Sequence, residues 1–136
     1  MTHQSLIPEG AEGAVAALKL SPGVLSAGHV FVTGMTGSSP DGTMPDAPEQ
    51  QFRQAFDKVA VVLGEAGLDF GAVVEMTSYH LGLREHFDLF NDVRSDYVRA
   101  PYPAWTAVEV AGLRREGALV EIRVIAATPA GADAPA

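Results

Sequence analysis

Apolar and polar residues alternate with a period of two in several stretches of the chain, which is the pattern of half-buried β-strands. Residues 24–34 contain two such runs, joined at Gly28, and predict a β-hairpin or two strands of a meander. Residues 73–81 are rich in β-branched side chains and predict a third strand. We expect Val73, Glu75, Thr77, Tyr79 and Leu81 on one face of that strand and Val74, Met76, Ser78 and His80 on the other.

Two further strands are predicted near the end of the chain, at residues 105–110 and 118–126. The segment between them, GLRREG, contains Arg114 and Arg115 and is interpreted as a solvated hairpin turn. The five predicted strands together are enough for one sheet.

Apolar residues recur every three or four positions between residues 47 and 66, which predicts an amphipathic helix. Asp46 is a candidate N-cap residue for this helix, Glu49 stands at the capping-box position, and Gly67 can end it. The apolar face is expected to contain Phe52, Phe56, Val59 and Leu63, and the polar side Gln51, Arg53, Asp57 and Lys58.

A second helix is predicted over residues 86–98, because aromatic residues recur there at helical spacing and Pro101 prevents its continuation. Residues 38–50 concentrate Ser, Pro, Asp and Gly and predict a surface loop. The two ends, residues 1–14 and 128–136, are rich in Gly, Pro and Ala and are expected to be loose.

The resulting order β-β-α-β-α-β-β indicates a two-layer α+β domain. Each helix has one apolar stripe, so both helices are expected to cover the same face of a single mixed sheet. A chain of 136 residues is the size of one domain, and we expect one domain over residues 1–136.

Composition and charge narrow the range of functions. Hydrophobic residues make up 47% of the chain, so part of the apolar surface is expected to face another subunit. A formal net charge of -8 disfavours nucleic acids and anionic membranes as partners. With no cysteine, no signal-peptide pattern and no apolar run of membrane-spanning length, we expect a cytoplasmic protein without disulfides.

The chain contains none of the common catalytic or metal-binding motifs. Its four histidines form neither an HxH nor an HExxH pair, so we expect no metal and no cofactor. The glycines of residues 31–37 either occupy special backbone angles or, with the Thr33 hydroxyl, present N–H groups to a small anion or carbonyl. Ser26 and Ser78 have no identifiable partner for nucleophilic catalysis.

Glu121 is the most informative acidic residue. It is predicted to share one face of the last strand with Arg123, while Val120 and Ile122 form the apolar face. An exposed charged face or a weak salt bridge explains this pattern. If oligomerisation covers the face, the Glu121 carboxylate is partly desolvated and can hold a water or transfer a proton. The sequence is compatible with both interpretations.

Four segments resemble the YjgF/Rid proteins, a family of reactive-intermediate deaminases also labelled endoribonucleases. They are HVFVTGMTG, QFRQAFDKVAVVLGEAGLDFGAVVEMTSYHL, HFDLFNDV and PYPAWTAVEVAGLRREGALVEIRVIA, within residues 20–127. The last is similar to the family signature Pro-Ala-Arg-(Ser/Thr)-x-Val-Glu-Val and the Val-Glu-Ile strand that follows it. The resemblance implies a chorismate-mutase-like fold of the bacillus type and a homotrimer with a central β-barrel and ligand pockets at the subunit clefts.

The resemblance also assigns roles to individual residues. Glu121 matches the catalytic glutamate that positions the hydrolytic water, and Gly34 matches a backbone donor beside the ligand. Asn91 matches a helix asparagine near the cleft. Thr33 stands where a serine is usual and preserves its hydroxyl, whereas Ala107 replaces a common cysteine.

Trp105 stands at the position of the signature arginine, which in the deaminating members binds the carboxylate of a 2-imino acid. Indole offers one N–H donor and no charge, so Trp105 cannot form that bidentate ion pair. A ligand-facing aromatic wall and ordinary packing in a core or interface explain a tryptophan at this position equally well.

The sequence therefore favours a protein that binds or hydrolyses a small imine- or enamine-type metabolite other than the usual imino acids, with Glu121 as the acid–base residue. The alternative is a noncatalytic protein that binds a small molecule and serves a pathway as an accessory factor. The charge of -8 and the lack of a basic stripe weigh against a ribonuclease.

Overall fold

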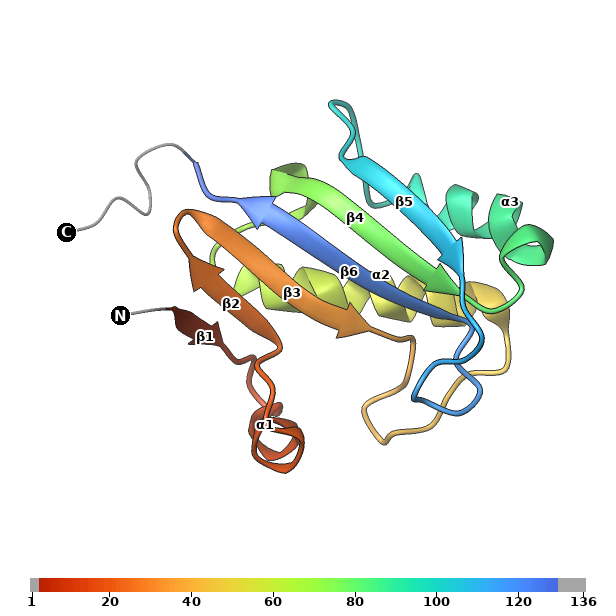
Figure 1. The fold of residues 1–136 in the computed structure, drawn as a ribbon, viewed down its shortest axis with the longest axis horizontal. Helices are drawn as coiled ribbons and strands as arrows, with labels where there is room; N and C mark the ends of the chain where they lie inside the picture. Colours follow the sequence, from red (N-terminus) through yellow and green to blue (C-terminus); the bar gives the residue numbers. More distant parts are fainter. Residues whose placement is uncertain (1–2, 130–136) are drawn as a thin grey trace.

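Residues 3–129, described by a computed structural model, form one six-stranded sheet with the strand order β1-β2-β3-β6-β4-β5 (Figure 1). Neighbouring strands are antiparallel except β4 and β5, which are parallel. The elements are β1 (Gln4–Leu6), α1 (Glu12–Leu18), β2 (Gly23–Ser26), β3 (His29–Met35), α2 (Pro48–Gly64), the 3₁₀ turn η1 (Phe70–Ala72), β4 (Val73–His80), α3 (Leu83–Arg94), β5 (Ala104–Glu109) and β6 (Val120–Ala127).

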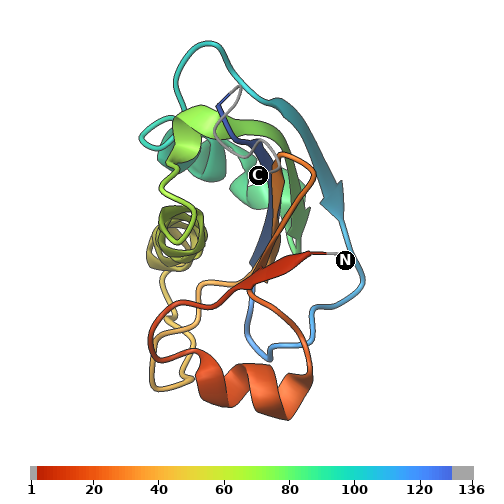
Figure 2. The ribbon, with the colours of Figure 1, turned by 90° about the vertical axis from the view of Figure 1, so that its left-hand side faces the viewer.

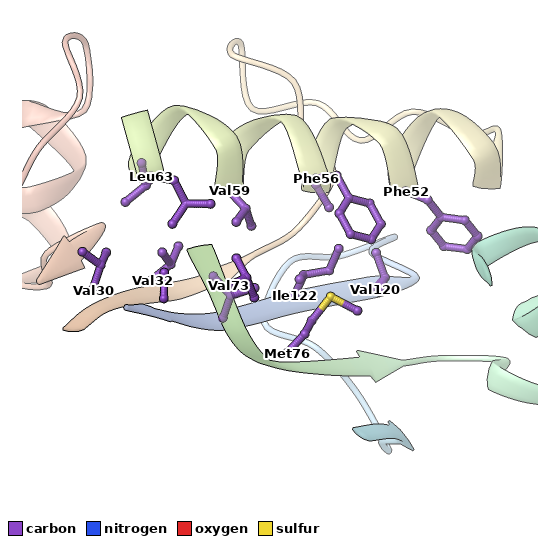
Figure 3. Close-up of a cluster of buried hydrophobic side chains, with 14 of the residues drawn as sticks. Val30, Val32, Phe52, Phe56, Val59, Leu63, Val73, Met76, Val120 and Ile122 are labelled. Carbon is purple, nitrogen blue, oxygen red and sulfur yellow. The ribbon is translucent and has the colours of Figure 1, made fainter. Parts of the chain in front are cut away.

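Helices α2 and α3 lie on the same side of the sheet, as the sequence predicted (Figure 2). The core fills the space between α2 and the sheet, where the side chains of both layers interdigitate (Figure 3). Among the described residues no helix covers the opposite face, on which Phe31 and Val108 are exposed. We call that surface the open face.

The prediction of loose termini is wrong for most of the N-terminal segment. β1 pairs with β2, Leu6 is buried in the core, and α1 follows as a third helix. A three-residue strand carries too little periodicity to be read from sequence, because its pairing comes from a partner some twenty positions away. At the other end of the chain, the Thr128 N–H donates a hydrogen bond to the Gly28 carbonyl. Residues 130–136 of the predicted loose tail lie outside the described residues, as do residues 1–2.

α2 confirms the predicted amphipathic helix, with its four predicted apolar residues fully buried. Its start differs from the expectation: the N-cap is Ala47 rather than Asp46, and the Glu49 carboxylate accepts a hydrogen bond from Arg53 instead of closing a capping box. Pro48 occupies the first turn and has no N–H to satisfy, so the helix starts without a side-chain cap.

Gln51 was predicted on the polar side of α2, and this prediction is wrong. The side chain is buried, and its amide donates to the carbonyls of Pro45 and Gly117 while its oxygen accepts from the Leu119 N–H. A fully hydrogen-bonded amide can be buried at small cost. Gln51 thereby holds the segment that leads into β6 and so fixes the position of that strand.

A register shift in β4 overturns the predicted face of Val73. Val73 pairs with Ala126 and Glu75 with Ile125, so one residue of β4 is extra at this point. As a result Val73 is buried together with Met76, while Val74 is exposed. The rest of the strand keeps the predicted alternation.

The predicted hairpin between the last two strands does not form. β6 lies between β3 and β4, whereas β5 pairs with β4 and stands at the edge of the sheet, so Arg114 and Arg115 belong to a longer connection across the sheet end. α3 supplies the crossover that makes β4 and β5 parallel. It begins at Leu83, before the predicted residue 86, because the Glu109 carboxylate at the end of β5 accepts from the N–H groups of Gly82 and Leu83.

Candidate functional site

Glu121 lies on the open face of β6, with its carboxylate directly over the backbone of Gly34 in β3. A Cβ added to Gly34 would overlap that carboxylate, so only glycine leaves room for it. The side chain is partly exposed, and Tyr79 of β4 is its cross-strand neighbour on the other side. The predicted acid–base residue and the predicted backbone donor are therefore in contact.

A β-bulge places Thr33 and Gly34 opposite a single residue of β6. Val32 pairs with Val124 and Met35 with Ile122, which leaves two residues of β3 across from Arg123. The Thr33 hydroxyl donates to the Ser21 carbonyl at 2.7 Å. It therefore remains available to a ligand as an acceptor.

Trp105 lies on the opposite side of the sheet, facing α3. Its ring is parallel to Phe87, with centroids 5.6 Å apart, and lies 6.0 Å from the ring of Phe90. The guanidinium carbon of Arg94 lies 3.9 Å from the Trp105 ring centroid, which is the geometry of a cation–π contact. Within the chain, the tryptophan thus packs β5 against α3.

The indole N–H of Trp105 is also engaged. It donates to Oγ of Ser78 at 2.9 Å, and the same hydroxyl lies 2.8 Å from Nε2 of His80. Burial lowers the pKa of His80 to about 4, with a smaller contribution from His86 and an opposing one from Glu109. At neutral pH His80 is therefore uncharged.

Ser78 does have a histidine partner, which the sequence did not reveal, but the pair lies in the core. Ser78 and His80 are essentially inaccessible to solvent, and the His80 ring packs edge-to-face on Phe90 at 4.7 Å. A buried serine without access for a substrate does not act as a nucleophile. The hydrogen bonds that link Trp105, Ser78 and His80 form a structural network.

Asn91 and Trp105 are connected through Arg94. The Arg94 Nε–H donates to Oδ1 of Asn91 at 3.3 Å, and the guanidinium then reaches the indole ring. Desolvation by the surrounding side chains lowers the pKa of Arg94, while Tyr102 opposes this shift. Arg94 thus places a guanidinium group against the Trp105 ring on the side of α3.

Ala107 lines a cavity of about 550 Å³ between the end of β5 and the start of α3. Glu109 also lines it, and the two backbone N–H groups at the start of α3 lower the pKa of the Glu109 carboxyl by donating to it. Because Glu109 already occupies this helix terminus, the cavity does not favour an anionic ligand there.

The six predicted site residues therefore form two groups on opposite sides of the sheet. Thr33, Gly34 and Glu121 lie on the open face, whereas the other three lie on the side of α3. A single chain does not bring the groups together. The two groups can form one site only if residues of different copies of the chain meet. The roles of the six residues therefore stay predictions.

Metal-binding side chains do not gather anywhere in residues 3–129: no three of the types His, Cys, Asp and Glu are placed to share an ion. Over the same residues, no helix is long and apolar enough to cross a membrane.

Sequence reasoning missed Ser78 and Arg94 as partners of Trp105. Phe87 and Arg94 are seven positions apart, which places them on one face of a helix and was a usable signal. The pairing of β4 with β5 brings Ser78 beneath the indole, and no local pattern indicates that pairing.

Replacing Trp105 by phenylalanine is expected to lower the free energy of unfolding by about 1–3 kcal/mol, because the buried Ser78 hydroxyl loses its indole partner. Urea unfolding followed by far-UV circular dichroism measures this change. Tyr102→Phe removes a hydroxyl from an exposed neighbour and should change stability by less than about 0.5 kcal/mol. Equal effects of the two substitutions would show that the hydrogen bond contributes nothing.

Comparison with known proteins gives one family. The model of the endoribonuclease L-PSP family matches residues 12–128. The RutC family protein YjgH of Escherichia coli is 36% identical over 126 residues, which cover 92% of this chain and 95% of that protein. The 2-iminobutanoate/2-iminopropanoate deaminase of Bos taurus is 32% identical over 108 residues, 78% of this chain and 77% of the deaminase.

The fold agrees with these matches. The solved structure of protein YJGH superimposes with a TM-score of 0.85 at 34% sequence identity, covering 95% of this chain and 98% of that one. The mixed sheet of this chain, with its three helices, is therefore also the fold of protein YJGH.

Proposed function

Because the chain belongs to the endoribonuclease L-PSP family, also known as YjgF/Rid, we propose that it hydrolyses a small imine- or enamine-type metabolite in a cleft between copies of itself. The observation that carries the proposal is the Glu121 carboxylate, which lies on an uncovered sheet face directly over the backbone of Gly34. The deaminase activity in the name of the bovine relative supports the reaction class.

The division of the predicted site into two groups supports a cleft between chains. The open face carries exposed or half-buried apolar side chains, among them Phe31, Tyr79 and Val108, that a second copy would cover. The edge strand β5 and helix α3 of one copy would then face Glu121 of the next. A homotrimer with a central barrel, as the family resemblance implies, is the assembly we propose.

In the proposed reaction, water adds to the carbon of the C=N bond. Glu121 accepts a proton from this water and returns it to the nitrogen, and the tetrahedral adduct collapses to a carbonyl compound and ammonia. The Thr33 hydroxyl and the Gly34 backbone are placed to contact the reacting group. The overall balance is imine plus water to carbonyl plus ammonia.

The substrate is proposed to differ from the usual 2-imino acids. Trp105 has no charge, and its N–H is already bonded to Ser78, so it offers a ligand only the exposed part of its ring. The guanidinium of Arg94 is held by Asn91 and by the indole face, and it belongs to α3 rather than to β5. A planar or apolar, less acidic metabolite suits this surface better than a small carboxylate.

Glu121→Gln is expected to reduce turnover by about 100-fold or more, because glutamine keeps the shape of the side chain but cannot accept the proton. Ammonia release from a panel of freshly generated imines and enamines, including 2-aminoacrylate, measures the effect. Glu75→Gln removes a carboxylate from an exposed position of β4 and serves as the matched control with unchanged turnover.

The panel also tests selectivity. Efficient hydrolysis of 2-aminoacrylate or of imines of small neutral amino acids would show that the loss of the signature arginine did not end deamination of the usual substrates. Saturable ligand binding without turnover, unaffected by Glu121→Ala, would instead identify a noncatalytic binding protein.

A further inference from the structure

A second cluster of reactive side chains lies between α2 and the loop that precedes it. Nζ of Lys58 lies 2.9 Å from Oγ of Ser38. Both residues line a cavity of about 360 Å³, together with Ser39 and Gln54. The cluster contains none of the six residues of the candidate site on the sheet.

Lys58 is an unusual lysine. Burial lowers its pKa to about 8, and the positive charge of Arg115 adds to the shift. The ion pairs found in residues 3–129 do not include Lys58. Asp57 also lines the cavity, but its carboxylate accepts a hydrogen bond from the Tyr97 hydroxyl. The Asp41 carboxylate in the preceding loop accepts one from the Thr43 hydroxyl. A substantial fraction of Lys58 is therefore neutral in mildly alkaline solution.

The segment that carries Ser38 is held in place by its surroundings. The Gln54 amide donates to the Gly37 carbonyl at 2.7 Å and to Oγ of Ser39 at 3.2 Å, which fixes the loop on α2. Gly37 packs so closely on the backbone of Gln51 that a Cβ there would overlap its carbonyl. The serine is thus presented to Lys58 by a rigid segment.

A serine hydroxyl bonded to a desolvated lysine is the arrangement that a Ser–Lys pair needs for nucleophilic catalysis. The neutral amine accepts the hydroxyl proton, and the alkoxide then attacks. Positive charge nearby, here on Arg115, favours the negative oxygen that forms in the tetrahedral adduct. The open cavity beside Ser38 leaves space for a small molecule.

We propose that Ser38 and Lys58 form a nucleophile–base pair that reacts with small activated acyl compounds. Oγ of Ser38 bonds to the acyl carbon, its proton passes to Nζ of Lys58, and the leaving group departs with that proton. Water then cleaves the Ser38 ester with Lys58 again acting as base, and the products are a carboxylic acid and the free enzyme. The pair is a second reactive site, independent of Glu121.

The experiment uses the full chain and 4-nitrophenyl acetate. We expect release of 4-nitrophenolate that increases with pH around a midpoint near 8, with the acetyl group found on the Ser38 peptide by mass spectrometry. Ser38→Ala should reduce the rate by about 100-fold or more. Ser26→Ala, which changes a serine of β2 outside the cavity, should leave the rate unchanged.

Lysine substitutions separate base catalysis from folding. Lys58→Arg keeps a cationic donor for Ser38 but cannot lose its proton at these pH values, so it should fold and still lose the reaction. Lys19→Arg changes the only other lysine of the chain, and this variant should keep the reaction. Acetylation of the Lys58 amine itself, or a rate that Ser38→Ala leaves unchanged, would overturn the proposal.

Discussion

Phe56→Ala is expected to lower the free energy of unfolding by about 3–5 kcal/mol, a large share of the roughly 5–15 kcal/mol that stabilises a typical domain. The Phe56 ring is fully buried at the centre of the helical layer. It stacks on Tyr97 with centroids 4.7 Å apart and on Phe90 at 5.5 Å, and it also contacts Phe70. Truncation to alanine removes these aromatic contacts and leaves a cavity among the three neighbours.

Urea unfolding at a fixed protein concentration measures this effect, since an oligomer has a concentration-dependent stability. Val61→Ala, on the exposed side of the same helix, should change stability by less than about 0.5 kcal/mol. If both variants lost the same amount, the packing of Phe56 between α2 and α3 would not be the source of the stability.

Acidification is expected to destabilise the fold before the carboxylates titrate. The pKa of His80 is about 4 in the folded state, whereas an unfolded histidine titrates near its ordinary value of 6.5. Between these values the unfolded chain binds more protons, so stability decreases as the pH falls. The loss begins below pH 6.5, amounts to about 2 kcal/mol by pH 5, and approaches about 3 kcal/mol below pH 4.

In the His80→Gln variant, stability should change little between pH 6.5 and 5. Replacing the exposed His29 by glutamine should leave the pH dependence of stability unchanged. Glu109 contributes at lower pH, because its pKa is depressed from a value of 4.5. A direct check is the proton NMR titration of the His80 ring in the native protein. A midpoint near 6.5 would contradict both the buried neutral histidine and the predicted acid loss.

Helix α2 and strand β6 show which structural features a local sequence pattern can predict. The i, i+3 and i+4 spacing of the apolar residues of α2 predicted both its extent and its buried face. The period of two in β6 correctly placed Val120 and Ile122 inside and Glu121 outside. These patterns are readable because each residue's burial follows from its position within one regular element.

Features that depend on contacts between two distant segments could not be predicted from such local patterns. Gln51 appears polar and exposed from its helix alone, and only the carbonyls of Pro45 and Gly117 explain its burial. The early start of α3 depends on a carboxylate from β5, and the altered face of Val73 depends on the pairing of β4 with β6.

The candidate site shows the same division. The resemblance to the family motif was recognised from sequence, because motif positions are local, and the assignment of Trp105 to the position of the signature arginine stays a prediction. The contact of Glu121 with Gly34, the partners of Trp105 and the Ser38–Lys58 pair depend on side chains from separate elements meeting in space.

The sequence by itself determined the fold class, the amphipathic faces of α2 and β6, and the family to which the chain belongs. The order of the strands, the separation of Glu121 and Trp105 to opposite faces, and the environments of His80 and Lys58 were decided only by the tertiary structure. The physical reason is that periodicity reports which side of an element is buried, whereas strand neighbours, hydrogen-bond partners and desolvation arise from packing between segments far apart in the chain.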